Sequence, residues 1–382
     1  MGYGNKYRRI LLIWLFVGLA MSVLHAQSNT FRTYVPIKPT NAQKLYFHIE
    51  STAFFKNNEY FSPYAYGFTG IGIYLKPTFD YYFSRNLKVT AGAYLLKYSG
   101  LDKISQAIPV FSVQYRVTKS FDLVMGNIYG TANHQLEEPL FRFDRFYQNH
   151  VEYGLQFLWH NKRIHSDLWL NWEHFIQLGD TAQEQLTVGN STRLLLLRQK
   201  GFRLILPIQF LFKHKGGQLA PEPHIPITTI FNGLSGLRLA YYFNKKTAIQ
   251  FSQLFLLYKA LSNPPEGTSV HLPFDKGWAS YSKINFRYKS FHFIAGYWKG
   301  ERFIAPLGET LFQSVSEIDP NYTQEDRSLI TSKISYHKNI YKGIRLEARA
   351  ASYFDTASKK LDYSYGLYIR INTDFFLCKV KR

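Results

Sequence analysis

The sequence predicts an all-β protein, a transmembrane antiparallel β-barrel of about sixteen strands with long extracellular loops and short periplasmic turns. Three observations support this: an N-terminal export signal, alternation of apolar and polar residues along most of the chain, and connections that alternate in length. Within hydrocarbon every backbone amide needs a partner, and a closed sheet supplies one without leaving an edge.

The first segment has the composition of a secretory signal peptide. Lys6, Arg8 and Arg9 precede an almost wholly apolar run, and the segment ends on a small residue, Ala26. The alternative is a retained N-terminal membrane anchor. The expected organisation is a signal peptide over 1–26, a periplasmic leader over 27–44 and an outer-membrane barrel over 45–382.

Period-2 alternation is cleanest in the segment 362–377. Leu367 and Ile369 share one face there, while Ser364 and Arg370 share the other. Successive side chains of a strand point to opposite sides, so one wall is apolar and the other polar. Strands are expected at 46–56, 70–83, 87–98, 107–118, 121–132, 149–160, 163–173, 184–197, 201–212, 227–243, 246–258, 277–288, 290–299, 327–337, 343–354 and 362–377.

The connections between these segments alternate between short and long. Short turns are expected at 84–86, 119–120, 161–162, 198–200 and 244–245. Long loops are expected near 57–69, 133–148, 213–226, 259–276 and 300–326. This asymmetry is typical of membrane barrels, in which the turns face the periplasm and the loops face the exterior.

A soluble β-sandwich would show the same alternation, with its apolar face turned inward. Aromatic residues at strand ends favour the membrane barrel, since Tyr81–Phe83, Trp159 and Tyr241–Phe243 stand where interfacial girdles are expected. Leu194–Leu197 and Leu254–Tyr258 are apolar on both faces. We therefore expect side chains or a loop to fill part of the lumen.

Composition narrows the class of protein further. The 382 residues include 46 Lys and Arg against 26 Asp and Glu, a net charge of +20, and one Cys. A single Cys excludes a disulfide framework and any site built from several thiolates. The positive charge suits lipopolysaccharide phosphates, an anionic solute or anionic headgroups at the periplasmic side, and nucleic acid is not an expected partner.

These features resemble those of Gram-negative outer-membrane β-barrel proteins of the porin type. The resemblance covers about residues 44–377 and lies in the export signal, the sixteen-strand alternation and the aromatic final strand. It implies an outer-membrane location, contact with outer-membrane lipid and lipopolysaccharide as partners, and insertion by the barrel-assembly machinery. Such proteins commonly end on an aromatic residue, whereas here Cys378–Arg382 follow Leu377.

Motifs that would indicate an enzyme are missing from the sequence. There is no GxSxG, HExxH, P-loop or dinucleotide-binding fingerprint. His165 and Ser166 are adjacent and so point to opposite faces of a strand, which prevents the histidine from activating the serine. Ser166 and Ser191 are interpreted as structural hydroxyls. We expect no enzymatic activity, no catalytic residue, no metal and no cofactor.

A charged segment in the expected loop near 133–148 is the strongest candidate for a ligand site outside the strands. A calcium or sugar site is one interpretation, but a solvated, salt-bridged loop is favoured; the residues are Glu137, Glu138, Arg142, Asp144 and Arg145. Five histidines lack metal-ligand spacing and are expected at the interface or facing water in the lumen: His134, His150, His160, His165 and His174.

The polar wall of the predicted barrel supplies the candidate functional residues. Acidic residues come from the sixth and seventh strands, and basic residues come mainly from strands on the opposite side of a sixteen-strand barrel. The expected pore-lining residues are Glu152, Asp167, Glu173, Lys283, Arg287, Lys333, Arg345, Glu347, Arg349 and Arg370. Opposed charges would create a transverse field that selects polar or anionic solutes. Alternatively these residues pair with their neighbours, as Glu347 would with Arg345 and Arg349.

The sequence therefore predicts a porin-like passive channel for small polar or anionic solutes. One alternative is a non-channel surface barrel that binds polysaccharide or assists envelope assembly. A lipid-modifying enzyme is disfavoured by the lack of a Ser–His arrangement. The solute, the oligomeric state and the openness of the lumen are left open by these patterns.

Overall fold

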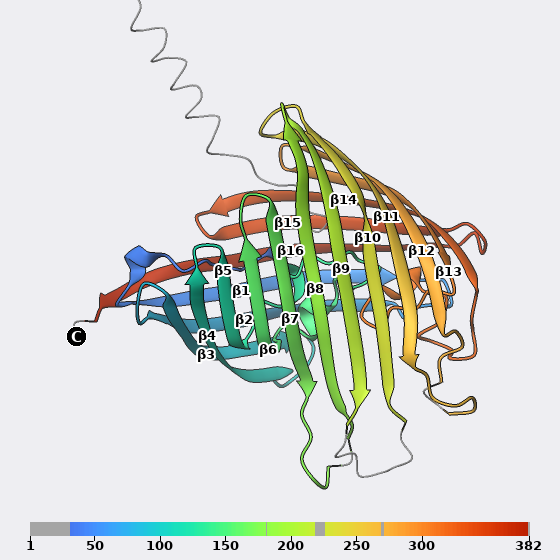
Figure 1. Ribbon diagram of the computed structural model, residues 1–382, viewed down its shortest axis with the longest axis horizontal. Helices are drawn as coiled ribbons and strands as arrows, with labels where there is room; N and C mark the ends of the chain where they lie inside the picture. Colours follow the sequence, from blue (N-terminus) through green and yellow to red (C-terminus); the bar gives the residue numbers. More distant parts are fainter. Residues whose placement is uncertain (1–30, 181, 218–225, 269–270, 381–382) are drawn as a thin grey trace, which may run out of the picture.

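Sixteen antiparallel strands close into a single barrel in the structure, a computed structural model that describes residues 31–180, 182–217, 226–268 and 271–380. The expected signal peptide, residues 1–26, lies outside the described residues. Each strand pairs with its neighbours in the chain, and β1 pairs with β16 to close the ring. Figure 1 shows the strands of the two opposite walls crossing, as the tilt of strands in a closed barrel requires.

The strands end within a few residues of their expected positions, with few exceptions. They are β1 (Lys44–Glu59), β2 (Phe68–Tyr82), β3 (Leu87–Tyr98), β4 (Gln106–Thr118), β5 (Phe121–Asn127), β6 (Tyr153–His160), β7 (Ile164–His174), β8 (Glu184–Gln199), β9 (Phe202–Gly216), β10 (Thr228–Tyr242), β11 (Thr247–Ser262), β12 (Lys276–Tyr288), β13 (Phe291–Glu301), β14 (Asp326–Tyr341), β15 (Ile344–Asp355) and β16 (Leu361–Lys379). The short helical segments are η2 (Pro39–Asn41), η3 (Thr131–Asn133), α2 (Arg145–Gln148) and η4 (Thr310–Phe312).

The outward face of the barrel is apolar and the inward face is packed. On β11, Phe255 and Leu257 are exposed, whereas Leu254, Leu256 and Tyr258 between them are buried. A continuous apolar wall of this kind is stable only in hydrocarbon, and a closed antiparallel barrel is the form in which strands cross the outer membrane. The predicted fold and outer-membrane location are confirmed. In the described ranges no helix is long and apolar enough to span a membrane.

The largest difference from expectation lies at the fifth and sixth strands. β5 ends at Asn127 rather than at residue 132, and β6 begins at Tyr153 rather than at residue 149. Gly126 adopts a φ of +94°, a conformation that glycine tolerates without a steric penalty. Beyond Asn127 the chain leaves the wall and forms a long connection, residues 128–152, which we name the inserted loop.

The inserted loop lies inside the barrel, where it touches inward-facing residues around the whole circumference. Asn58 of β1 donates to Asp144 at 2.8 Å, and Tyr353 of β15 donates to Glu138 at 2.7 Å. On the other side, Arg238 of β10 donates to Glu137 at 2.7 Å. Only a segment within the lumen can reach strands so far apart in the ring. Figure 1 shows the helical turns of this loop between the two walls.

Two further segments complete the filling of the lumen. The β13–β14 connection buries Phe303, Leu311 and Phe312, and these pack with Leu254 and Tyr258 in one hydrophobic core. From the N-terminal side, Phe31 packs edge-on against rings of the inserted loop. The expectation that the doubly apolar segment Leu254–Tyr258 faces a filled lumen is therefore confirmed. At Leu194–Leu197 it does not hold, because Leu196 and Leu197 are exposed.

The inserted loop is salt-bridged as predicted, but the expectation that it is solvated was wrong. Glu137, Glu138 and Asp144 pair with cations of the inner wall, and Glu137 is only 2% exposed. Arg142 pairs instead with Glu317 of the β13–β14 connection. Burial of such a carboxylate is stable because two cations, Arg238 and Lys283, pair with it. The expectation that His134 and His150 face water was wrong for the same reason, since both rings are buried against carboxylates.

Candidate active site

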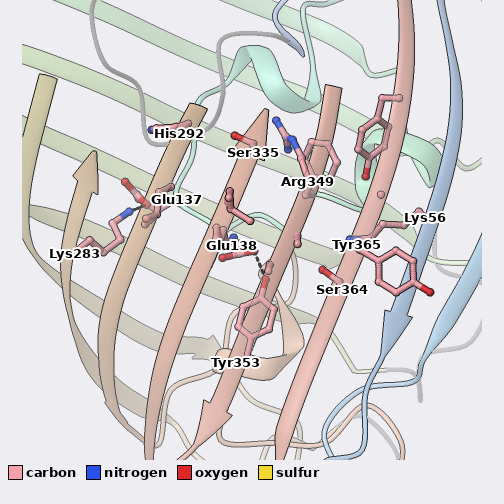
Figure 2. A pocket seen from close by; sticks show the side chains of 18 of the residues that line it. Lys56, Glu137, Glu138, Lys283, His292, Ser335, Arg349, Tyr353, Ser364 and Tyr365 are labelled. Carbon is pink, nitrogen blue, oxygen red and sulfur yellow. Dashed lines mark hydrogen bonds and ion pairs between the residues drawn. The ribbon is translucent and has the colours of Figure 1, made fainter. Parts of the chain in front are cut away.

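A large cavity lies between the inserted loop and the wall formed by β12 to β16 and β1. It has a volume of about 900 Å³, including its open mouth, and its lining combines Glu137 and Glu138 of the loop with side chains of the wall. Figure 2 shows this cavity with the charged side chains of the loop facing those of the wall. A concave site of this size with convergent polar groups is where a ligand site is expected.

Three chemically distinct side chains stand side by side on the wall of this cavity. His292 of β13 is the register partner of Ser335 of β14, and Ser335 is in turn the register partner of Arg349 of β15. All three line the cavity. Directly opposed residues of an antiparallel pair have Cβ atoms about 4.5–5.5 Å apart, so the serine hydroxyl is within reach of the imidazole after rotation about χ1. Figure 2 shows the three on adjacent strands.

A hydrogen bond fixes the orientation of His292. Its Nε2 lies 2.5 Å from the Oδ1 of Asn285, a buried residue of β12. Because an amide oxygen only accepts hydrogen bonds, Nε2 carries the proton and Nδ1 of the neutral ring is left as an acceptor. A serine beside an acceptor nitrogen, with a third group orienting the ring, is the arrangement of nucleophilic catalysis.

Cations surround Ser335 on the inner wall. Arg349 stands beside it on β15, and Lys333 precedes it by two residues on the same face of β14. Lys333 forms an ion pair with Glu138, which also accepts a hydrogen bond from Tyr353. Cationic groups next to a nucleophile stabilise the oxyanion that forms when an ester carbonyl is attacked.

His134 is a second conspicuous histidine, but its ring is fully engaged. Nδ1 lies 2.8 Å from a carboxylate oxygen of Asp167, and Nε2 lies 3.1 Å from one of Glu152. The ring also stacks on Trp169, with 3.6 Å between the ring centroids. Burial alone would lower the pKa of His134, but the ion pairs with Glu152 and Asp167 outweigh burial and raise the pKa to about 9. A histidine charged at neutral pH cannot serve as a general base, so we assign His134 to anchoring the loop.

His48 of β1 offers a rival constellation elsewhere on the inner wall. It lies between its register partners Thr78 and Asp374, and its Nδ1 is 2.6 Å from an Asp374 oxygen. An internal threonine is a poorer nucleophile than serine, since threonine nucleophiles are activated chiefly by an N-terminal amine. Ser335 is therefore the stronger candidate.

A buried carboxyl with an unusual environment lies in the β13–β14 connection. Burial, followed by the nearby charges of Asp144 and Glu138, raises the pKa of Glu309 to about 8. The Glu309 carboxyl is therefore protonated at neutral pH and adds no negative charge beside Asp144 and Glu138.

Nine of the ten residues expected to line a pore lie on the inward side of the wall, Glu152 lies at the end of the inserted loop rather than on the sixth strand, and neighbouring groups hold most of the ten. Glu152 and Asp167 share His134, and Glu173 pairs with Lys213 at 2.7 Å. Lys283 pairs with Glu137, Lys333 with Glu138, and Glu347 with Arg349. Arg345 donates to Asn339 at 2.9 Å, Arg287 donates to the Lys245 carbonyl at 3.4 Å, and Arg370 lies over the Phe31 ring. Their role in solute passage stays a prediction.

The serines considered from the sequence are placed differently from Ser335. Ser166 faces outward and shares a 2.6 Å hydrogen bond with Thr192, and Ser191 accepts a long hydrogen bond from Gln209. The Ser335–His292 pair was missed because a long connection, 302–325, separates the two residues in the chain. No local spacing signals such a pair; only the register of β13 against β14 brings it together.

The family comparison decides the class of protein. Residues 37–380 match the family described as Lipid A 3'-O-deacylase-type. The chain belongs to this family. The expectation that the protein is not an enzyme is overturned by this membership, because the family is described by an enzymatic activity. No curated protein sequence matches this member of the family significantly.

Several solved outer-membrane barrels are similar in shape to this deacylase-type protein. The Vibrio cholerae outer-membrane protein OmpT lacking loop L8 is 11% identical, with a TM-score of 0.48 over 86% of this chain and 99% of its own. OprD of Pseudomonas aeruginosa is 12% identical, with a TM-score of 0.44 over 90% of this chain and 97% of its own. OccAB3 of Acinetobacter baumannii is 11% identical, with a TM-score of 0.46, covering 87% of this chain and 99% of its own. Likeness at this level carries no argument about function.

Proposed function

We propose that this protein is an outer-membrane ester hydrolase that removes an ester-linked acyl chain from a glycolipid of the lipid A type. Ser335 is the nucleophile, His292 the general base and Asn285 the residue that orients His292. Arg349 and Lys333 stabilise the negative charge that develops on the carbonyl oxygen. The observation that carries the proposal is the register that sets Ser335 between His292 and Arg349 on the wall of the cavity beside Glu137 and Glu138.

The reaction proceeds in two balanced steps. The Ser335 Oγ attacks the ester carbonyl while its proton passes to His292 Nδ1, and the tetrahedral oxyanion faces the cations. Collapse breaks the bond to the sugar oxygen, which takes the proton from His292 and leaves as a hydroxyl. Water, deprotonated by His292, then attacks the acyl-serine and releases the fatty acid and free Ser335.

The test uses the processed protein in detergent micelles with purified lipid A. Mass spectrometry is expected to show a product lighter by one acyl chain, together with the free fatty acid. Ser335→Ala is expected to lower the rate at least a thousand-fold. Ser332→Ala is the matched control, because Ser332 lies on the same strand but faces outward and bonds Ser352 at 2.8 Å. Full activity in Ser335→Ala would exclude this nucleophile, and an inactive but folded wild-type protein would exclude the activity.

Passive diffusion of small polar or anionic solutes is the second candidate function. It is supported by three cavities of about 630–900 Å³ that lie beside the inserted loop along the charged wall. Single-channel conductance of the refolded protein in a planar bilayer tests it. Steady anion-selective steps that persist in Ser335→Ala would support a channel, and a folded but silent protein would exclude one.

A further inference from the structure

A second cavity lies on the other side of the inserted loop from Ser335. Its volume is about 670 Å³, including its open mouth. Strands β6 to β10 form its wall, Arg32 and Tyr34 of the N-terminal segment form one side, and Asn133 and Gln135 of the inserted loop cover it. None of the residues assigned to the hydrolytic reaction lines this cavity.

Nitrogen-bearing side chains stand in a row on the wall of the second cavity. His160 of β6 is the register partner of His165 of β7, and His165 is the register partner of Arg193 of β8. Arg238 of β10 lies on the same wall beyond β9. With Arg32 opposite, three guanidinium groups from separate parts of the chain converge on one small volume.

Three nitrogen atoms in this row are buried and lack a hydrogen-bond partner among the described residues. They are His160 Nδ1, Arg193 Nη1 and Arg238 Nε. Leaving a buried guanidinium donor unsatisfied, as at Arg193 and Arg238, costs free energy, and such groups in native proteins normally have a partner. All three belong to residues that line the second cavity, where a ligand with several acceptor atoms could supply the missing partners.

The acidic groups close to the cavity do not neutralise this cluster. Asp167 lines the cavity, but one of its oxygens contacts His134 at 2.8 Å and the other accepts from Gln156 at 2.9 Å. Glu137 accepts from Arg238 Nη2 but is shared with Lys283. The cavity therefore retains excess positive charge, and an anion is the complementary ligand.

We propose that this cavity binds a phosphate monoester. A phosphate group carries close to two negative charges and three terminal acceptor oxygens, which matches several guanidinium and imidazole donors arriving from different directions. A cavity of this volume also leaves room for a sugar or glycerol attached to the phosphate. The site does not depend on Ser335, so it can be present whether or not the protein hydrolyses esters.

The experiment is isothermal titration calorimetry of the processed protein in zwitterionic detergent micelles. Glucose 6-phosphate tests a soluble phosphate monoester, and phosphatidic acid in mixed micelles tests a lipid headgroup. Glucose and phosphatidylcholine are the corresponding controls. Arg193→Gln removes the guanidinium group whose Nη1 lacks a hydrogen-bond partner. Arg203→Gln is the matched control, because Arg203 is a buried inward-facing arginine of β9 that stacks on Tyr242 outside the cavity.

The proposal is supported if either monoester binds the wild-type protein, binds Arg193→Gln at least ten-fold more weakly and binds Arg203→Gln with unchanged affinity. The monoester that binds identifies the source of the phosphate. Arg193→Lys, which keeps the charge but not the fork, is expected to bind with intermediate affinity. Absence of binding to both monoesters in the wild-type protein overturns the proposal. Equal weakening in Arg193→Gln and Arg203→Gln also overturns it, because the effect would then be that of general charge. Unchanged mobility on unheated gels confirms that each variant is folded.

Discussion

Ser335 lies directly opposite His292 in the antiparallel pair formed by β13 and β14, and both residues line the same cavity of the lumen. His292 is held on its far side by Asn285. The wall of a barrel fixes such pairs firmly, because moving either residue requires a shift in register along the whole strand pair. The serine and the histidine are therefore presented on a rigid scaffold rather than on mobile loops.

Asn285 is expected to act by positioning His292. Asn285→Ala should lower kcat for lipid A deacylation about ten- to a thousand-fold while leaving KM nearly unchanged, because Asn285 is buried behind His292 and is not among the residues that line the cavity. Asn285→Asp keeps an acceptor oxygen and should recover much of the rate. Kinetics with mass-spectrometric detection check this; a rate in Asn285→Ala equal to that of the wild type would remove Asn285 from the mechanism.

Glu137 is expected to be the main anchor of the inserted loop. Glu137→Gln leaves Arg238 and Lys283 as buried cations with a weaker partner, and removing one member of a buried ion pair costs about 3–5 kcal/mol. Urea unfolding of the refolded protein in micelles measures this loss. Glu325→Gln, at an exposed ion pair with Arg302, is the control and should leave the midpoint unchanged. Equal midpoints for both variants would show that Glu137 does not hold the loop.

The stability of the protein is expected to fall as pH rises past neutrality, because of His134. The pKa of His134 is about 9 in the folded state and 6.5 in the unfolded state. The stabilisation that its ion pairs with Glu152 and Asp167 give to the fold is therefore fully present below pH 6.5 and is lost as the pH rises through 9. The loss amounts to about 3 kcal/mol. Unfolding free energies between pH 6 and 10 check this. His134→Gln should flatten the profile in that window, whereas His271→Gln, in a surface loop, should not; identical profiles for the wild type and His134→Gln would contradict the assignment.

Glu309 is expected to destabilise the loop packing at alkaline pH. Its folded-state pKa of about 8 lies above the unfolded value of 4.5, so its contribution to stability is present below pH 4.5 and is lost as the pH rises through 8. Glu309→Gln removes the charge that forms, and the variant should be more stable than the wild type at pH 9. The two proteins should differ less at pH 5. A variant that is less stable at pH 9 would show that the ionised carboxylate is favourable there.

The fold could be predicted because alternation, turn composition and strand length are local properties of a chain. The strands of a membrane barrel pair with their sequence neighbours, so their order in the sequence also fixes their order in the ring. The sixteen predicted strands were confirmed for this reason. The apolar run Leu254–Tyr258 even indicated that the lumen is filled.

The contents of the lumen and the Ser335–His292 pair could not be predicted because they depend on contacts between residues far apart in the sequence. The inserted loop has the polar composition of a surface loop. The partners of its Glu137 and Glu138 are Arg238, Lys283 and Lys333, which all lie more than 100 residues further along the chain. The register of β13 against β14 likewise crosses the connection 302–325. His165 and Ser166 are adjacent in the sequence, but their side chains face opposite sides of the barrel wall.

The most direct measurement of the central claim is covalent labelling of the folded protein with a fluorophosphonate, a reagent that reacts with activated serine hydroxyls. Peptide mass spectrometry is expected to find a single label, on Ser335, and labelling should abolish lipid A deacylation. His292→Ala should prevent the labelling, since the hydroxyl is then not activated. Loss of deacylation with the label on another residue, or deacylation that continues with Ser335 fully labelled, would contradict the account.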